Sequence, residues 1–214
     1  MEPISVNMQS SIRISGSKVL YFDPLERSEK HDADYIFITH PHYDHFSLLS
    51  ILELKKDNTV FITPKDIVEE LLSIGISEEY ICVVKPCMTY NFRNLEIKTI
   101  PAYNLHKSFH PKANGWVGYI VFFDGLSYCV SGDTDVTSYL KSVKCDVLFL
   151  AIGGTYTMDC LEGASLCNII NPKLVIPTHY GYATGTYKDA LVFKKKLNHG
   201  IHCKLLIPEK IEKE

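Results

Sequence analysis

Three histidines and an aspartate crowd one short segment of the chain, ITHPHYDHFS, at residues 38–47. The chain has nine histidines, and three of them, His40, His42 and His45, fall within six consecutive positions together with Asp44. Imidazole nitrogen and carboxylate oxygen are ligands for divalent transition metals. A lone histidine is more often an ordinary core or surface residue, but this concentration favours a metal site.

The expected backbone divides these side chains into two pairs. His40 precedes a proline and is therefore biased toward extended geometry, in which residues i and i+2 point the same way. His40 and His42 are expected to aim at one point. Asp44 and His45 follow about one turn later, before a predicted helix, and are expected to face a second point nearby. The segment thus predicts a ligand set split between a pair of metal ions.

The segment at 40–45 follows an apolar strand and resembles the HxHxDH motif of the metallo-β-lactamase-fold hydrolases. The order and spacing of further motifs agree with that family from about residue 10 to residue 206. The family has an acidic bridging ligand and a late histidine after two later strands, and "YCVSGDTD" and "LVIPTHYG" supply Asp133 and His179. "GGTYTMD" and "THYG" further resemble the branch of ascorbate-6-phosphate lactonase-like proteins.

One ligand position departs from the family pattern. Where the family has a further histidine soon after a strand, "TIPAYNLHKSFHPKANGWVGYIV" has Asn104. His110 and His106 are both near enough to replace it, and His110 is preferred because it precedes a proline, as His40 does. Asn104 is expected to ligate weakly, to hold a ligand by a hydrogen bond, or to contact substrate.

The resemblance implies two metal ions and a hydrolytic reaction. One ion would be held by His40, His42 and His110, the other by Asp44, His45 and His179, with Asp133 bridging them. Zn²⁺ is the expected metal for such a set, and Mn²⁺, Fe²⁺ or Ni²⁺ are alternatives. A water activated by the dinuclear site would cleave a small ester, lactone or phosphoester. Asp44 is the expected catalytic residue, because it would both ligate an ion and orient that water.

Four further residues lie in loops next to the expected ligands. Lys112 is expected to meet an anionic group of the substrate, or else to be simply solvated. Tyr156 and Tyr180 are expected to donate hydrogen bonds to a developing oxyanion or to pack the pocket wall. Asp135 is expected to cap the helix that follows it or to support the site.

These residues need strands and helices to position them. Strands are predicted at 10–14, 18–22, 34–38, 59–63, 80–84, 95–100, 117–123, 126–130, 146–152, 173–179 and 202–208. Helices are predicted at 47–56 with Ser47 as N-cap, 64–75, 136–143, 160–170 with an Asp159–Glu162 capping box, and 187–198. The mixture predicts an α/β or α+β protein, with sheets covered by helices. The resemblance makes this a four-layer αββα sandwich with two mixed sheets, formed by one domain over residues 1–214.

The composition limits the classes of partner and the location. Net charge is −3, and there is no basic excess of the kind that nucleic-acid binding requires. The N-terminal sequence lacks signal-peptide features, and no apolar run reaches the ~18 residues of a membrane span. Seven cysteines without a CxxC pair, most of them in apolar runs, indicate buried thiols in a reducing cytoplasm. A small-molecule substrate is therefore expected, and a homo-oligomer is left open.

Two other functions compete with the small-molecule hydrolase. The same fold could act as a phosphodiesterase or nuclease, although the charge balance disfavours a nucleic-acid substrate. The chain could also be a non-catalytic metal-binding sensor or scaffold, for which Asn104 leaves some room.

Overall fold

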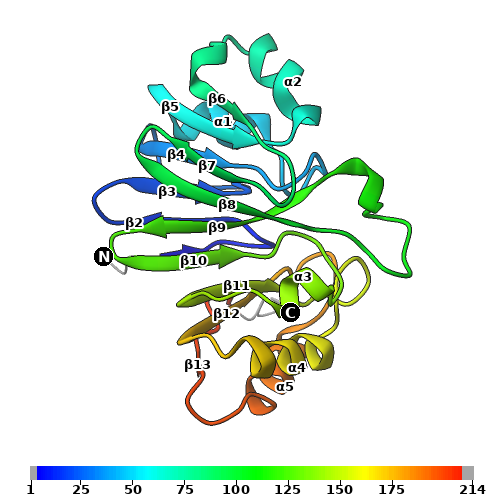
Figure 1. The fold of residues 1–214 in the computed structure, drawn as a ribbon. Helices are drawn as coiled ribbons and strands as arrows, with labels where there is room; N and C mark the ends of the chain where they lie inside the picture. The colour runs from blue at the N-terminus through cyan, green and yellow to red at the C-terminus, as the bar shows by residue number, and fades with distance from the viewer. Residues whose placement is uncertain (1–3, 209–214) are drawn as a thin grey trace, which may run out of the picture.

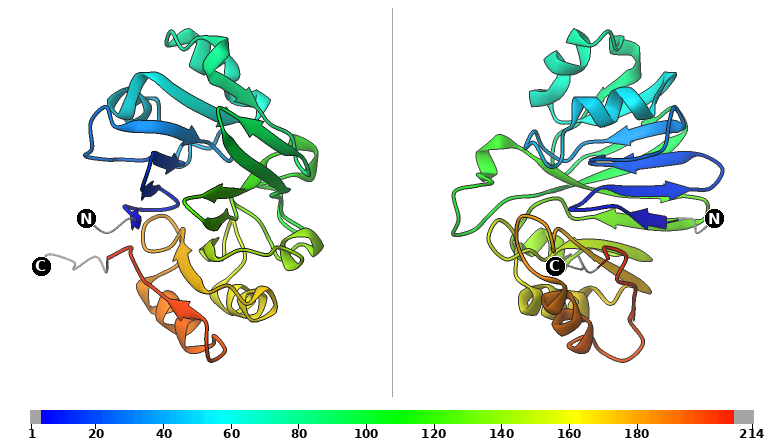
Figure 2. Two further views of the ribbon diagram at one scale, coloured as in Figure 1. Left: turned by 60° about the vertical axis from the view of Figure 1, so that its left-hand side comes forward. Right: turned by 180° about the vertical axis from the view of Figure 1, so that it is seen from behind.

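Two mixed β-sheets pack face to face, and helices cover both outer faces of the pair (Figures 1 and 2). This computed structural model describes residues 4–208. The four-layer αββα sandwich with two mixed sheets that the sequence predicts is confirmed.

In the described part of the chain the first sheet has six strands, which lie side by side in sequence order. They are β1 (Ile4–Val6), β2 (Ile12–Ser15), β3 (Val19–Phe22), β4 (Ala33–Phe37), β5 (Lys55–Thr63) and β6 (Ile81–Val83). Strands β1 to β3 pair antiparallel, and β3 to β6 pair parallel. Helices connect β4 to β5 and β5 to β6, whereas residues 23–32 join β3 to β4 as a loop without a helix.

The second sheet has seven strands among the described residues, and consecutive strands again lie side by side. They are β7 (Thr89–Phe92), β8 (Leu95–Pro101), β9 (Val117–Phe123), β10 (Leu126–Val130), β11 (Val147–Ala151), β12 (Leu174–Thr178) and β13 (His202–Cys203). Strands β7 to β10 pair antiparallel, and β10 to β13 pair parallel. Strands β8, β10, β11 and β12 therefore all run in one direction and end at the same edge.

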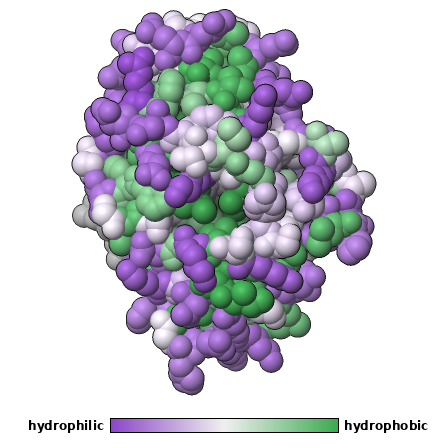
Figure 3. Space-filling model, viewed as in Figure 1, coloured by the Kyte–Doolittle hydropathy of each residue, from purple (hydrophilic) through white to green (hydrophobic). Residues whose placement is uncertain are grey.

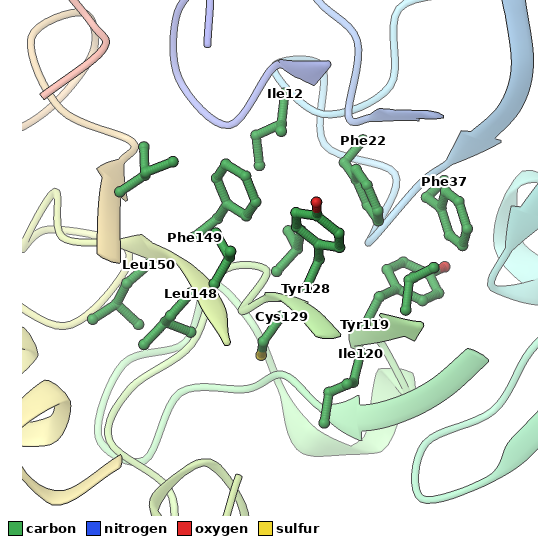
Figure 4. Packing of buried hydrophobic residues seen from close by; sticks show 14 of the residues in the cluster. Ile12, Phe22, Phe37, Tyr119, Ile120, Tyr128, Cys129, Leu148, Phe149 and Leu150 are labelled. Atoms are coloured by element: carbon green, nitrogen blue, oxygen red, sulfur yellow. The ribbon is translucent and has the colours of Figure 1, made fainter. Parts of the chain in front are cut away.

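Aromatic side chains fill the space between the two sheets. Phe22 and Phe37 of the first sheet stack with ring centroids 4.5 Å apart, and Tyr119 of the second sheet meets Phe37 edge-on at 5.2 Å (Figure 4). The Tyr119 hydroxyl is buried and donates to the carbonyl of Ile38 at 2.6 Å. This bond ties the end of β4 to the second sheet, so the loop after β4 is held against the loops of the other sheet.

Five α-helices within residues 4–208 form the outer layers. They are α1 (Leu48–Leu54), α2 (Val68–Ser73), α3 (Ser138–Lys141), α4 (Cys160–Ile170) and α5 (Tyr187–Lys195), with 3₁₀ turns at Lys65–Ile67, Glu78–Tyr80 and Lys112–Asn114. A separate apolar cluster joins α1 and α2 to the first sheet, while α4 and α5 pack on the main core at the second sheet. The Ser47 cap of α1 and the capping box of α4 are confirmed.

Several predicted boundaries are wrong. The helix predicted at 47–56 ends at Leu54, because Lys55 is extended and pairs with Ala33 of β4. The helix predicted at 64–75 begins as a 3₁₀ turn and is α-helical only over α2, and the one predicted at 187–198 ends at Lys195. The strand predicted at 202–208 is two residues long. The short strands β1 and β7 were not predicted, since three or four residues carry too little periodicity.

The helix predicted at 136–143 shrinks to the four residues of α3. Its N-cap is Thr137, whose hydroxyl accepts from the Leu140 N–H. Asp135 was one of the residues expected there, and its carboxylate instead accepts from Lys107 Nζ at 2.7 Å and from the Leu105 N–H at 2.8 Å. Asp135 thus supports the loop after β8 and does not cap a helix.

The visible surface is mostly polar. Polar side chains dominate the face in Figure 3, and hydrophobic residues interrupt them along its middle. No helix within residues 4–208 is long and apolar enough to cross a membrane. All seven cysteines are free, as predicted, but only Cys82, Cys129 and Cys167 are buried, and Cys87 is exposed.

Candidate metal centre

The histidines and aspartates singled out in the sequence gather at one edge of the sandwich. His40, His42, Asp44 and His45 follow β4, while the other ligand candidates follow β8, β10 and β12 of the second sheet. The Val117 N–H donates to the Thr39 carbonyl at 3.3 Å and joins the two sheets beside the cluster. Segments far apart in the chain are therefore fixed around a common point.

One group consists of three imidazoles. The Nε2 atom of His40 lies 3.1 Å from Nδ1 of His42 and 3.3 Å from Nε2 of His110. The ring of Trp116 packs against all three, with centroid distances of 5.0–5.6 Å. The nitrogens of the three histidines lie within 4.8 Å of one another, close enough to share one ion.

A second group combines a carboxylate with two imidazoles. Oδ2 of Asp44 lies 3.3 Å from Nε2 of His179 and 3.6 Å from Nε2 of His45. Asp133 stands between the two groups: its Oδ2 atom is 3.1 Å from His179 Nε2 and 3.5 Å from His110 Nε2. Its Oδ1 atom is 3.4 Å from His45 Nε2. Asp133 therefore contacts members of both groups at once.

Hydrogen bonds to the Nδ1 atoms of two histidines in the first group leave their Nε2 lone pairs free to bind a cation. His110 Nδ1 lies 3.0 Å from Asn104 Oδ1, an acceptor, so the proton sits on Nδ1. His40 Nδ1 lies 2.9 Å from the Thr39 hydroxyl, which itself donates to Asp23, so His40 is also protonated on Nδ1. The two Nε2 lone pairs then face each other at 3.3 Å, an arrangement that repels without a cation between them. Ligands at ~2.1 Å from a tetrahedral Zn²⁺ are about 3.4 Å apart, so the spacing suits a divalent ion.

Asp23 orients the ring of His45 by a hydrogen bond. The side chain is fully buried, and Oδ2 accepts from His45 Nδ1 at 2.7 Å. Its two oxygens also accept from the Thr39 N–H and hydroxyl. His45 Nε2 is left buried with no hydrogen-bond partner among the described residues. Such a carboxylate–histidine pair presents the second nitrogen to a metal and increases its basicity.

The cluster divides electrostatically into a neutral and a charged half. Burial and the neighbouring His45 lower the pKa of His40 well below its usual range, and burial lowers the pKa of His110 to about 4. Burial also opposes the charged form of His179, but Asp133 outweighs it and raises that pKa to about 9. The pKa of His45 is raised well above its usual range by Asp133 and Asp23 against the cost of burial. Without a metal, protons on these two imidazoles balance the carboxylates, and ligands must lose such protons to bind a metal.

Asn104 supports a ligand candidate and does not face the cluster centre. Its Oδ1 atom accepts from both the backbone N–H and Nδ1 of His110, at 3.1 and 3.0 Å. Its amide nitrogen donates to the Tyr156 carbonyl at 2.9 Å and to Asp135 Oδ1 at 3.2 Å. Both ends of the amide are thus used within the protein. Of the roles expected for Asn104, the geometry supports the hydrogen bond to a ligand and not the contact to substrate.

Three candidates for substrate contacts have different surroundings. Tyr180 is wrong as an oxyanion donor, because its buried hydroxyl donates to the Ile207 carbonyl at 3.3 Å. Tyr156 is half-buried, and its ring meets Phe109 edge-on at 4.6 Å in the neighbouring loop. Lys112 is exposed, with its ammonium 5.1 Å from the centre of the Tyr103 ring. Tyr156 and Lys112 stay candidates for substrate contacts.

Two neighbours of the cluster were not found in the sequence. Asp23 precedes a proline in "YFDPLER", and Gln9 lies in a polar turn, where its Nε2 atom donates to Asp44 Oδ2 at 2.7 Å. Neither belongs to a motif, and each acts over a distance in sequence that local patterns do not reveal. A groove of about 770 Å³ beside α3, lined by Lys98, Tyr139 and Cys145 among others, includes none of the clustered residues.

Replacing the two competing histidines separately should distinguish them. His110 is buried in the cluster, whereas His106 is exposed. We expect His110→Ala to lower the metal content of the protein and His106→Ala to leave it unchanged. The measurement is elemental analysis after loading with Zn²⁺ and gel filtration. Equal metal content in His110→Ala and the unsubstituted protein would contradict the choice of His110.

Comparison with known proteins gives a consistent picture. The sequence profile of the family described as Beta-lactamase superfamily domain matches residues 9–179. A UPF0173 metal-dependent hydrolase of Pyrococcus furiosus is 29% identical in an alignment that covers 91% of this chain and 92% of that protein. A solved structure from Parabacteroides distasonis, provisionally assigned as a metal-dependent hydrolase, has a TM-score of 0.82 and 27% identity, covering 96% of this chain and 93% of that one. The metallo hydrolase Igni18 of Ignicoccus hospitalis shares the fold, with a TM-score of 0.73 at 22% identity over 97% of this chain and 95% of that one.

Proposed function

The chain belongs to the β-lactamase superfamily as a metal-dependent hydrolase, and from this premise we propose that it uses two divalent metal ions to cleave a small ester, lactone or phosphoester. The observation that carries the proposal is the place of Asp133. Its carboxylate lies within 3.5 Å of a nitrogen of His110, His179 and His45, and so connects a group of three imidazoles with a group centred on Asp44. One ligand shared by two adjacent groups is what a dinuclear centre needs.

The seven side chains divide into two sites in this proposal. His40, His42 and His110 would hold one ion, Asp44, His45 and His179 the other, and Asp133 both. Nitrogen and oxygen ligands without thiolate favour Zn²⁺, with Mn²⁺, Fe²⁺ and Ni²⁺ as alternatives. When bound, a pair of such ions lowers the pKa of water toward ~7 and polarises the bond to be cleaved.

Asp44 is the residue of this chain best placed to orient the attacking water. It is largely buried, yet its hydrogen bond to His179 and the charge of His45 hold its pKa below its usual range. The carboxylate is therefore ionised at neutral pH and accepts hydrogen bonds only. In the proposal it fixes the direction of a water proton and accepts it as the water attacks.

The substrate is proposed to be a small molecule, in line with the branch of ascorbate-6-phosphate lactonase-like proteins that the sequence resembles. Lys107, a half-buried lysine of the loop after β8, is already paired with Asp135 at 2.7 Å. Lys112 of the same loop remains to meet an anionic substrate group, and Tyr156 to donate to an oxyanion. With a net charge of −3, nucleic acid is not proposed as the substrate. A cytoplasmic location and self-association stay predictions.

Metal loading and a substrate screen test the proposal together. We expect about two divalent ions per chain by elemental analysis. We also expect hydrolysis of at least one of three probes, a nitrophenyl ester, a γ-lactone and bis(nitrophenyl) phosphate, that a chelator abolishes and added metal restores. Two ions without turnover of any probe class would favour the sensor or scaffold. A protein that takes up no metal and keeps its thermal stability in chelator would refute the whole scheme.

A further inference from the structure

The turn between β1 and β2 reaches into the metal centre. This turn lies beside the segment that follows β12 (Figure 2). The His179 N–H donates to the Gln9 carbonyl at 2.9 Å, and the hydroxyls of Ser10 and Thr178 lie 3.3 Å apart. Both Gln9 and His179 adopt left-handed backbone conformations, with φ of 46° and 60°, which is uncommon for residues other than glycine. The backbone contact therefore fixes where the Gln9 side chain starts.

The Gln9 side chain is fully buried and aimed at Asp44. Its Nε2 atom donates to Asp44 Oδ2 at 2.7 Å and lies 3.4 Å from His179 Nε2. The same Asp44 oxygen faces His179 and His45, so Gln9 contacts the oxygen that points into the second group. The carboxylate accepts only, which fixes the amide with its nitrogen toward Asp44.

The other end of this amide has no partner within the described residues. Gln9 Oε1 is buried and makes no hydrogen bond there. A buried unpaired acceptor costs about 1–3 kcal/mol. A side chain that served only to hold the turn would gain nothing from this arrangement, because the backbone carbonyl of Gln9 already makes that connection. The amide is placed for Asp44.

We propose that Gln9 is a positioning residue of the metal centre, which holds the Asp44 carboxylate toward His45 and His179 and thereby sets the affinity of the second ion. This inference rests on the proposed function in taking Asp44 as a ligand of that ion. Groups that hydrogen-bond metal ligands typically change metal affinity by about 10–100-fold when they are removed. Gln9 acts through Asp44 and needs no contact with substrate.

Two substitutions remove the hydrogen bond in different ways. Gln9→Met keeps the length of the side chain but loses the donor, and Gln9→Asn keeps the amide but withdraws it by one methylene. For both we expect the second ion to bind about 10–100-fold more weakly, with the first ion unaffected. Stepwise Zn²⁺ titration against a competing chelator gives the two affinities, and Co²⁺ absorption bands report which site is filled. Ser10→Ala is the control, because it alters the same turn through the Thr178 contact and should leave both affinities unchanged.

The outcomes separate this inference from the proposed function. If the unsubstituted protein binds two ions and both Gln9 variants keep the same second affinity, the positioning role is refuted and the dinuclear site stands. If the unsubstituted protein binds fewer than two ions, the dinuclear proposal fails, and crystal structures of the metal-free proteins then decide the role of Gln9. In those structures the Asp44 carboxylate should turn away from His179 in Gln9→Met. An unmoved Asp44 would overturn the inference.

Discussion

Asp133→Asn should empty both metal sites with one substitution. The exposed fraction of Asp133 is 3%. Its carboxylate oxygens lie within 3.5 Å of nitrogens from both proposed sites. Asparagine has the same shape, but its NH₂ end cannot ligate, and the negative charge that offsets the two ions is lost. Loss of a direct ligand should weaken metal binding by more than the ~100-fold that is the upper range for groups that only hydrogen-bond to the ligands. Metal per chain after dialysis, measured by elemental analysis, should fall from about two to well below one.

The same substitution on the surface provides the matched control. Asp124 is an exposed hairpin residue whose carboxylate accepts from the Ser17 N–H and hydroxyl, and its left-handed φ of 48° suits asparagine. Asp124→Asn should keep both ions. Circular dichroism should show that both variants retain the fold. Retention of two ions in folded Asp133→Asn would refute the bridging role.

The part of the site that the sequence reveals is the part that local geometry controls. His40 and His42 are two residues apart in an extended, proline-flanked segment, and their ring nitrogens do meet, at 3.1 Å. The preference for His110 over His106 came from the same pre-proline geometry, and His110 is the one that the fold brings into the cluster. Asp133 and His179 were placed by their positions after strands, which end at one edge of the second sheet. Motif and strand direction sufficed for these residues.

The residues that the sequence did not reveal act through tertiary contacts. Asp23 reaches His45 across 22 positions, and Gln9 reaches Asp44 across 35. Tyr180, by contrast, was expected to donate to an oxyanion and does not. It follows a histidine with a left-handed backbone, and its ring is directed into the core, where its hydroxyl finds the Ile207 carbonyl. Neither periodicity nor a motif in the sequence indicates this direction of the Tyr180 side chain.

The ends of the helices also divide into those that local sequence sets and those that tertiary contacts set. The capping box of α4 was visible because both of its side chains lie within one turn of the helix. The end of α1 was not, because Lys55 leaves the helix in order to pair with Ala33 on another strand. The identity of the substrate is set even further from local sequence, by loops that vary on a common scaffold.

Asp44→Asn is expected to reduce turnover by about 10²–10⁴-fold, the range for removal of a positioned acid–base group. Asparagine keeps an oxygen that can face the second ion, but it lacks the charge that accepts a proton from water. The amide also loses the pairing of Asp44 Oδ2 with His179 and His45, at 3.3 and 3.6 Å, so the second ion should bind more weakly. The fold should persist, because asparagine has the same size and shape as aspartate. The measurement is kcat on the substrate found in the probe screen.

Excess metal separates the two roles of Asp44. If Asp44 only held the ion, saturating Zn²⁺ would refill the site in Asp44→Asn and return most of the activity. If it also orients the water and accepts its proton, the site should refill while kcat stays low, and the deficit should lie in kcat and not in KM. The Asp124→Asn protein, measured alongside, should keep full turnover. Unchanged kcat in metal-loaded Asp44→Asn would exclude the proton-accepting role, and only the ligand role would remain for this carboxylate.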